Sequence, residues 1–269
     1  MFRERLTSWP NLFVGLVTLL AVIFLLAPLV ILTIQSFTAA SYLSFSPPSY
    51  GVRWYIEVFE SQDWRNSLIL SFVLGLIVTP LSLIIGTMAA LGLNRGPLRG
   101  RRELYALLIS PMVLPHIVLG LGIFRIALEL GISDSFWSFI PAHLTISVPF
   151  VVVTVTASLQ TFDISLEEAA RSLGASPLRA LWHVTFPVIA PGLIGGGIFS
   201  FIISFDEFII TFFLSTFKLT LPLQIFSTLM YQVKPSIAAV STLMLVITAL
   251  LTTVLLFRGQ VVSGSRVVR

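Results

Sequence analysis

Long apolar stretches alternate with short polar connections along the whole chain. Six of these stretches are long enough to cross a bilayer as helices, because its hydrocarbon core requires about 20 helical residues. They lie at roughly 11–35, 67–93, 104–124, 142–159, 191–214 and 236–257. The fourth is short, and the third and fifth are interrupted. The pattern predicts an all-α membrane protein with six transmembrane helices.

The first stretch also has features of a secretory signal. Arg3 and Arg5 precede it, and the small residues Thr38-Ala39-Ala40 follow it. Its apolar run nevertheless exceeds the ~7–15 residues of a signal-peptide core. We therefore interpret it as a retained membrane anchor.

Composition supports the membrane class. Apolar residues make up 56% of the 269 positions and charged residues 10%, and mean hydropathy is +0.99. Cysteine is absent, which excludes disulfides and thiolate chemistry. The net charge of +4 comes from basic residues that flank apolar stretches, so membrane orientation explains it better than nucleic-acid binding.

The basic residues also orient the predicted bundle. With the N-terminus inside, eleven arginines fall on the cytoplasmic side, against five basic residues outside. Because cytoplasmic connections carry an excess of Lys and Arg, both termini are expected in the cytoplasm. The polar loop at 160–190 then lies in the cytoplasm as well.

The longest outer connection spans residues 36–65. Pro47 and Pro48 mark a turn, and residues 52–59 are predicted to form a short interfacial helix. Aromatic side chains of this kind suit the headgroup zone: Trp54, Tyr55 and Trp64. Docking of an extracytoplasmic partner is the alternative role for this connection.

The cytoplasmic loop has the signals of two helices joined at a glycine. Asp163, Glu167 and Glu168 suit the start of a helix, where acids meet the positive end of its dipole. Gly174 is placed to end that helix, and Pro177 to begin a second one. This elbow could transmit a push to or from a partner; the alternative is an ordinary solvated connection.

Signatures of catalytic chemistry are missing. A phosphate-binding G-x-x-x-x-G-K-[ST] loop cannot exist, because the only lysines, Lys218 and Lys234, follow Phe217 and Val233. The three histidines lie far apart, at positions 116, 143 and 183, and no H-E-x-x-H occurs. We expect no catalytic residues, no metal site, and no cofactor bound by this chain.

Two adjacent acids interrupt the fifth apolar stretch. Placing Asp206 and Glu207 in a bilayer costs at least about 2.5–3.5 kcal/mol each when ionised, so they should face a cavity or a partner. On a continuous helix they would point ~100° apart, with Glu207 on the small and polar stripe of Gly196, Ser200 and Thr211. We favour a role in the substrate pathway, together with Ser204. The alternative is that one acid caps a broken helix or pairs with a base.

Two further irregularities interrupt the apolar pattern. Pro111 and Pro115 should kink the third stretch, and His116 then borders the pathway or is hydrogen-bonded between packed helices. Gly192 and the glycines at 195–197 permit either close helix packing, which is the commoner use, or bending at a gate.

The cytoplasmic loop resembles the EAA loop of permease subunits in bacterial ATP-binding-cassette (ABC) importers. Its Glu168-Ala169-Ala170, Gly174 and Phe186-Pro187 keep the spacing of that pattern, with Val184 and Phe186 replacing Ile and Leu. The resemblance implies the type I importer permease fold, with one transmembrane domain over 1–269 and a coupling loop at 160–190. The residues that it implies in coupling to an ATPase are Glu167, Glu168, Ala169, Ala170, Gly174, Ala175 and Pro187.

Within that family the chain is most similar to the second permease subunits of spermidine/putrescine importers. The resemblance rests on Ser204-Phe205-Asp206-Glu207, on the stretch 221–227, and on Arg53-Trp54-Tyr55. It implies a second permease subunit, an ATPase dimer that uses ATP and Mg²⁺, an extracytoplasmic binding protein, and a polyamine as substrate. His116 departs from the acid often found there, so opines, amino-acid derivatives and aminophosphonates remain alternative substrates.

Two other classes of function were weighed. An autonomous secondary transporter or channel also uses broken helices and buried acids, but no inverted repeat is visible and the elbow would be unexplained. A membrane enzyme is disfavoured by the missing catalytic residues. The importer permease is the preferred interpretation.

Overall fold

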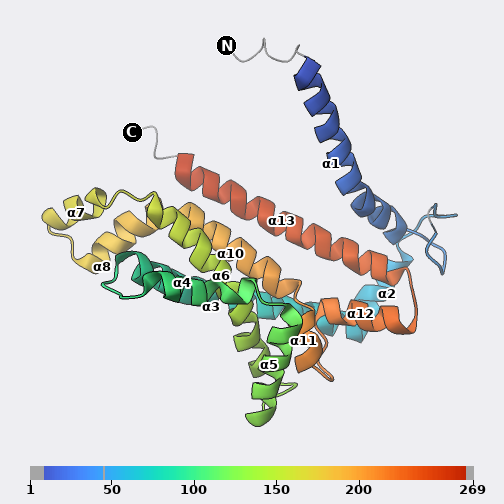
Figure 1. The fold of residues 1–269 in the computed structure, drawn as a ribbon. Helices are drawn as coiled ribbons and strands as arrows, with labels where there is room; N and C mark the ends of the chain where they lie inside the picture. Colours follow the sequence, from blue (N-terminus) through green and yellow to red (C-terminus); the bar gives the residue numbers. More distant parts are fainter. Residues whose placement is uncertain (1–8, 45, 265–269) are drawn as a thin grey trace. The chain divides into compact units, whose positions relative to one another are not determined.

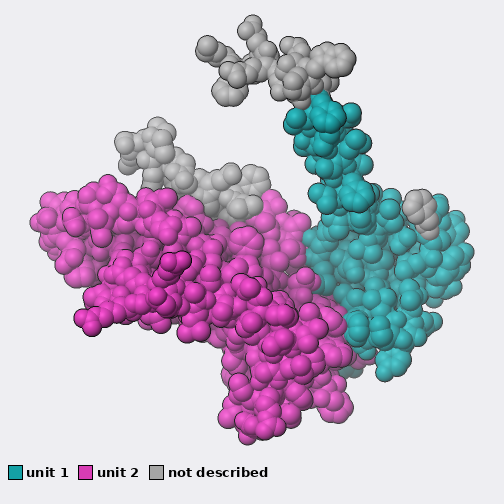
Figure 2. All heavy atoms as spheres, in the orientation of Figure 1, with its two compact units in different colours: residues 1–62, 225–246 teal, residues 63–224, 247–269 magenta. Residues whose placement is uncertain are grey.

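The computed structural model describes residues 9–44 and 46–264, and the side chains of 13–44 and 46–254. Within these residues the secondary structure is helical, apart from one isolated bridge between Thr38 and Tyr50. The chain divides into two compact units, Met1–Gln62 with Ile225–Val246 (unit 1) and Asp63–Gln224 with Ile247–Arg269 (unit 2) (Figure 2). Each unit is described by itself. The single permease domain expected from the sequence stays a prediction.

The predicted spans correspond to helices in the described residues. Four helices are long and apolar enough to cross a membrane, and two bent helix pairs raise the number to as many as six. The four are α1 (Trp9–Ser36), α3 (Gln62–Arg95), α6 (Phe136–Gln160) and α13 (Ser236–Gly264) (Figure 1). The structure therefore confirms an all-α membrane fold, in which two of the expected spans are broken.

The outer connection in unit 1 forms the predicted short helix, α2 (Arg53–Glu60). Trp54 does not lie in an exposed position as expected for a headgroup anchor. Its side chain is buried, and its indole N–H donates to the carbonyl of Ala40 at 3.0 Å. The Tyr55 hydroxyl lies 2.6 Å from that of Ser36 and ties α2 to the end of α1. Trp54 is thus a packing residue of this connection, because a buried indole needs an acceptor for its N–H.

In unit 2, α6 packs along α10 (Ala190–Phe205), and both helices pass through the core (Figure 1). One apolar cluster gathers Leu74, Phe139, Ile146 and Ile210, all nearly or fully buried. A second cluster lies further along α6 and includes Val151, Val155, Leu159, Ala90 and Ile189. α6 is the central element of unit 2 because its residues contribute to both clusters.

Glycines set the distance between α6 and α10. A Cβ atom at Gly196 would stand 2.7 Å from the Thr154 hydroxyl and 3.2 Å from the Val151 Cα. One at Gly192 would stand 2.8 Å from the Thr154 carbonyl oxygen, whereas one at Gly195 would meet nothing within 4 Å. Close packing is therefore what Gly192 and Gly196 provide. This is the commoner of the two uses considered from the sequence.

The third span is broken as its two prolines predict. α4 (Arg101–Ile109) continues into a 3₁₀ turn at Ser110–Met112, and α5 (His116–Glu129) then leaves at an angle of 96°. Pro111 and Pro115 lack the backbone N–H that would continue the helical ladder. His116 consequently begins α5 and lies at the bend.

The fifth span is not one continuous helix. α10 ends at Phe205, residues 206–208 are non-helical, and α11 (Ile209–Leu214) follows. The placement of Glu207 on one helical stripe with Gly196, Ser200 and Thr211 was therefore wrong, because no single helix runs through these positions. α11 packs against α5, and the chain then continues into α12 (Leu221–Tyr231). Both acids instead occupy a helix break, where backbone groups need partners other than the helix itself.

The polar loop at 160–190 forms the predicted elbow. α7 (Ser165–Ser172) is followed by α8 (Pro177–Ala180), a π-helical turn at Leu181–Thr185 and α9 (Phe186–Val188), which precede α10 at a bend of 72°. Gly174 has a left-handed φ of 91°. Its N–H donates to Arg171 and that of Ala175 to Ala170, a Schellman ending that satisfies the last carbonyls of α7. Gly174 thus ends α7 as expected.

Asp134 ties together two loops at the opposite end of unit 2. Its Oδ1 accepts the backbone N–H groups of Thr216 at 2.9 Å and Phe217 at 3.1 Å, with that of Lys218 at 3.5 Å. Burial alone would raise the pKa of Asp134. The three N–H donors and the Lys218 charge outweigh it, so this pKa lies below its ordinary value. It is the ionised carboxylate of Asp134 that accepts these three hydrogen bonds.

We expect Asp134→Ala to loosen the loop at 215–219 without affecting the helices. Three amides would lose a charged acceptor, and their hydrogen exchange should speed up by about tenfold. Because the pKa of Asp134 is depressed in the folded chain, its contribution is complete above the ordinary pKa of Asp. It is lost only as the pH falls through the lower folded value. Hydrogen–deuterium exchange of residues 215–219 measures this, and Asp134→Asn, which keeps an acceptor, should be intermediate. Unchanged exchange in the alanine variant would contradict the tie.

Candidate functional site

The helix break at 206–208 is held by Glu207. Its side chain is only 5% exposed, and Oε1 accepts the backbone N–H of Ile210 at 2.8 Å, which caps the start of α11. Oε2 lies 3.3 Å from Nδ1 of His116 at the start of α5. Glu207 therefore both caps a broken helix and pairs with a base, as the alternative interpretation of the two acids expected. A buried carboxylate with these partners supports the break rather than facing an open pathway.

Asp206 lies beside Glu207 but differs in environment. Its side chain is exposed, and it forms no ion pair with any residue that the structure describes. Its backbone N–H completes the last turn of α10 by donating to Ile202 at 2.9 Å. Of the two adjacent acids, Asp206 is the one available to a ligand.

A histidine absent from the predicted site joins the two sides of the break. His143 of α6 is completely buried, with Nδ1 2.9 Å from the Ser204 hydroxyl on α10 and Nε2 3.3 Å from the Thr211 hydroxyl on α11. A buried imidazole with two hydroxyl partners has both ring nitrogens satisfied. His143 therefore fixes α10 and α11 to the same helix across the residues where the helical ladder is missing.

The predicted substrate-pathway residues thus divide into two groups. Glu207 and His116 are brought together at the break, and Ser204 is used by His143, so these three have partners within the protein. Asp206 alone remains exposed with no charged partner among the described residues. His143 was missed because the sequence argument considered it only as a possible metal or catalytic group, and asked about packing between helices only for His116. An ionisable residue inside an apolar span is itself the signal that should have identified it.

The elbow presents a different candidate surface. Glu168, Ala169 and Gly174 are exposed, whereas Ala170, Ala175 and Pro187 are half-buried. Large apolar side chains are exposed around them: Leu166, Leu173, Leu178 and Trp182. Glu167 differs from Glu168, because it turns inward to Arg95. An exposed apolar surface with an acid at its side fits a protein partner.

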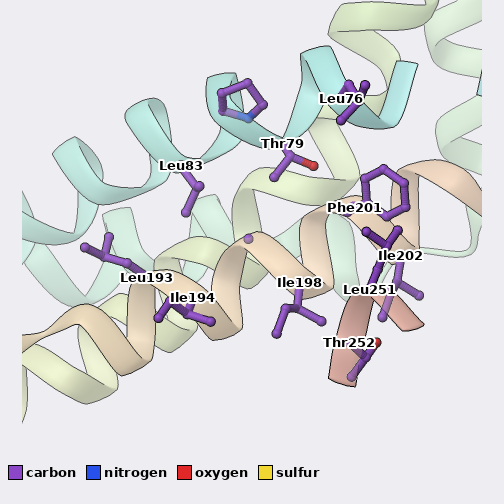
Figure 3. Close-up of a pocket in the computed structure, with 12 residues that line it drawn as sticks. Leu76, Thr79, Leu83, Leu193, Ile194, Ile198, Phe201, Ile202, Leu251 and Thr252 are labelled. Atoms are coloured by element: carbon purple, nitrogen blue, oxygen red, sulfur yellow. The ribbon is translucent and has the colours of Figure 1, made fainter. Parts of the chain in front are cut away.

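An apolar cavity of about 440 Å³ lies in unit 2 between α3, α10 and the end part of α13 (Figure 3). Figure 3 shows Leu83, Leu193, Ile198 and Phe201 around it. Thr79 contributes a hydroxyl, but this group donates to the Gly75 carbonyl at 2.7 Å. The lining offers nothing to a charged ligand, so the cavity does not compete with the helix break as a polar site. No group of three His, Asp or Glu side chains among the described residues could hold a metal ion.

Polyamine permeases are among the curated relatives of the chain. It is 32% identical over 225 residues to the spermidine/putrescine transport system permease protein PotC of Haemophilus influenzae, covering 83% of this chain and 87% of the relative. It is 31% identical over 240 residues to the putrescine transport system permease protein PotI of Escherichia coli K12, covering 85% and 84%.

Solved structures show the same fold at lower identity. A bacterial ABC transporter involved in the import of the acidic polysaccharide alginate matches with a TM-score of 0.70 at 20% identity, over 92% of this chain and 96% of that one. The MetNI methionine ABC transporter matches with a TM-score of 0.57 at 19% identity, over 78% and 97%.

A family model matches most of the chain. Residues 82–269 match the binding-protein-dependent transport system inner membrane component. This range contains the elbow, the helix break and most of the predicted spans. The chain therefore belongs to the family of binding-protein-dependent transport system inner membrane components and is an inner-membrane permease subunit of an ABC importer.

Proposed function

We propose that this chain forms one half of the translocation pathway of a polyamine importer, with a second permease subunit forming the other half. The observation behind this proposal is the helix break at 206–208. Glu207 is paired with His116 and caps α11, which leaves the exposed carboxylate of Asp206 as the acid at the break that has no such partner. A cationic substrate is the class that an uncompensated carboxylate attracts.

The pairing of Glu207 with His116 also matters for the choice of substrate, because His116 stands where polyamine permeases often have an acid. A free histidine beside the pathway would repel a dication when protonated. Here its Nδ1 faces Glu207 at 3.3 Å, so the imidazole is turned to an acid of the chain itself and is not a free group beside the pathway. The polyamine permeases PotC and PotI among the relatives favour the same substrate class. An opine, an amino-acid derivative or an aminophosphonate is the alternative cargo.

The elbow is proposed as the docking point of an ATPase made by another chain. Its exposed Leu173, Leu178 and Trp182 suit a cleft on a partner, and Glu168 adds a charged contact. ATP binding would close the ATPase dimer, move the elbow and open the permease pair outward. A loaded extracytoplasmic binding protein would then release its ligand near Asp206, and hydrolysis of the Mg²⁺-bound ATP by the partner would restore the inward-facing state.

Expression of this chain with its chromosomal neighbours, followed by gentle detergent purification, tests the proposal. We expect an ATPase and a second permease subunit to co-purify. ATP hydrolysis should rise several-fold with a binding protein loaded with putrescine or spermidine, because the loaded form favours one state of the pair. Stimulation only by a binding protein loaded with an opine, an amino-acid derivative or an aminophosphonate would show that this ligand, and not a polyamine, is the substrate. Absence of any ATPase from the complex would contradict the coupling role.

A further inference from the structure

Three side chains from distant parts of unit 2 meet behind the elbow. Nη1 of Arg95, the last residue of α3, lies 2.6 Å from Oε2 of Glu167 in the first turn of α7. The hydroxyl of Thr185, which ends the π-helical turn, donates to the same oxygen at 2.7 Å. One carboxylate oxygen therefore joins α3 to both arms of the elbow. We call Arg95, Glu167 and Thr185 the elbow clamp.

The clamp is shielded from solvent. The side chains of Arg95 and Glu167 are 24% and 15% exposed, and Thr185 is completely buried. The Arg95 guanidinium also lies over the ring of Phe162, 5.2 Å from its centroid. Charge-assisted hydrogen bonds of this kind are stronger than exposed ion pairs, which contribute little. The Arg125–Glu129 pair, at 74% and 59% exposure, is an example of the exposed kind.

The two neighbouring acids of the elbow, Glu167 and Glu168, point in different directions. Adjacent positions on a helix point about 100° apart. Glu167 faces Arg95 and Thr185, whereas Glu168 is exposed on the outer side of α7. Glu168 can reach a partner protein, but Glu167 is already occupied within the chain.

The clamp also connects the elbow to the long helix α3. Arg95 and Ser71 both lie on α3, 24 residues apart, or ~36 Å at ~1.5 Å per residue. The Ser71 hydroxyl accepts the backbone N–H of Leu221 at the start of α12, at 2.8 Å. The two contacts thus place α3 between the elbow and the segment that follows α11.

We propose that Arg95, Glu167 and Thr185 make the elbow and α3 move as one body, and that Glu167 acts as a positioning residue that does not touch the ATPase. This inference rests on the elbow being the element that an ATPase moves. It assigns the two acids different tasks: Glu168 receives the partner, and Glu167 passes the movement to α3.

Distance measurement between two spin labels tests the clamp directly. The chain has no cysteine, so Arg171→Cys on α7 and Met88→Cys on α3 provide two exposed labelling positions that avoid the side chains proposed for docking. In the purified complex in nanodiscs, the distance should be narrowly distributed with and without ATP and vanadate. Arg95→Ala and Glu167→Ala should each raise the population of displaced elbow conformations by about tenfold and make it nucleotide-dependent.

The matched control is Glu168→Ala, one position along the same helix. It should leave the distance narrow while weakening ATPase association. The double variant Arg95→Ala/Glu167→Ala should give a distribution no broader than Glu167→Ala alone, because Glu167→Ala already removes the interaction with Arg95. If an alanine variant does not reach the membrane, Glu167→Gln removes the charge that faces Arg95 while keeping an acceptor for Thr185, and it should still broaden the distribution.

Distance distributions as narrow as that of wild type in the Arg95 and Glu167 variants would overturn the proposal that the clamp holds the elbow to α3. Loss of the ATPase from the Glu167→Ala complex but not from Arg95→Ala would do the same, because Glu167 would then be a docking residue. A wild-type complex without ATPase would instead contradict the proposed function, while the distance distributions of the permease would still decide the clamp.

Discussion

Uptake of a cationic substrate is expected to fall by roughly tenfold to a hundredfold when Asp206 is replaced by asparagine. The replacement preserves shape but removes the only carboxylate at the break that has no charged partner among the described residues. Interactions with a charged group contribute about 1.5–3 kcal/mol, which corresponds to this range. Transport of labelled putrescine into proteoliposomes containing the complete complex measures the change. The amount of purified complex should equal that of wild type.

Glu207 provides the contrasting variant. Glu207→Ala leaves the Ile210 N–H and His116 without their acceptor, at a cost of about 1–3 kcal/mol for the buried N–H group alone. Its main effect should be a lower melting temperature and a smaller yield of folded permease. A normal uptake rate and affinity in Asp206→Asn would make Asp206 structural. A stable Glu207→Ala protein would remove the supporting role given to that residue.

Replacement of Gly196 by valine is expected to prevent assembly of the permease, whereas the same change at Gly195 should be tolerated. A side chain at position 196 meets Thr154 and the Val151 backbone on α6, so α10 would have to move away along the most extensive helix contact in unit 2. Overpacking of this kind costs about 1–3 kcal/mol or more, since backbone is one of the obstacles. Membrane levels and gel-filtration profiles of the two variants measure the difference.

The comparison between the two glycines controls for helix propensity. Both positions lie in the interior of α10, so the intrinsic cost of a β-branched residue is shared. Only position 195 has open space for a side chain. Equal losses in both variants would show that the glycines serve helix bending or gating, the alternative considered from the sequence, and not close packing.

The sequence was a good guide wherever one local rule decides the structure. Apolar length located the spans to within a few residues, because only helices satisfy the backbone inside a bilayer. Pro111 and Pro115 located the break before α5, and Gly174 the end of α7, since each follows from the backbone of a single residue. These features need no knowledge of which helices pack together.

The sequence was a poor guide where tertiary contacts decide. Hydropathy alone continued the fifth helix through Asp206, and only the pairing of Glu207 with His116 and Ile210 shows why it stops at Phe205. Trp54 was expected at the headgroups because its indole suits them, but the Ala40 carbonyl offers it a buried acceptor. Glu167 could not be distinguished from Glu168 without knowing where Arg95 ends α3.

The apolar side of the elbow has a consequence for how cells keep the subunits in proportion. If the elbow docks an ATPase as proposed, a copy of this chain made without that partner would hold Leu173, Leu178 and Trp182 uncovered, on a loop of a chain fixed in the membrane. Chaperones and proteases act on exposed apolar surface of this kind. The surface proposed for docking would then also mark an orphan subunit for removal, and the supply of ATPase would set how many permeases persist.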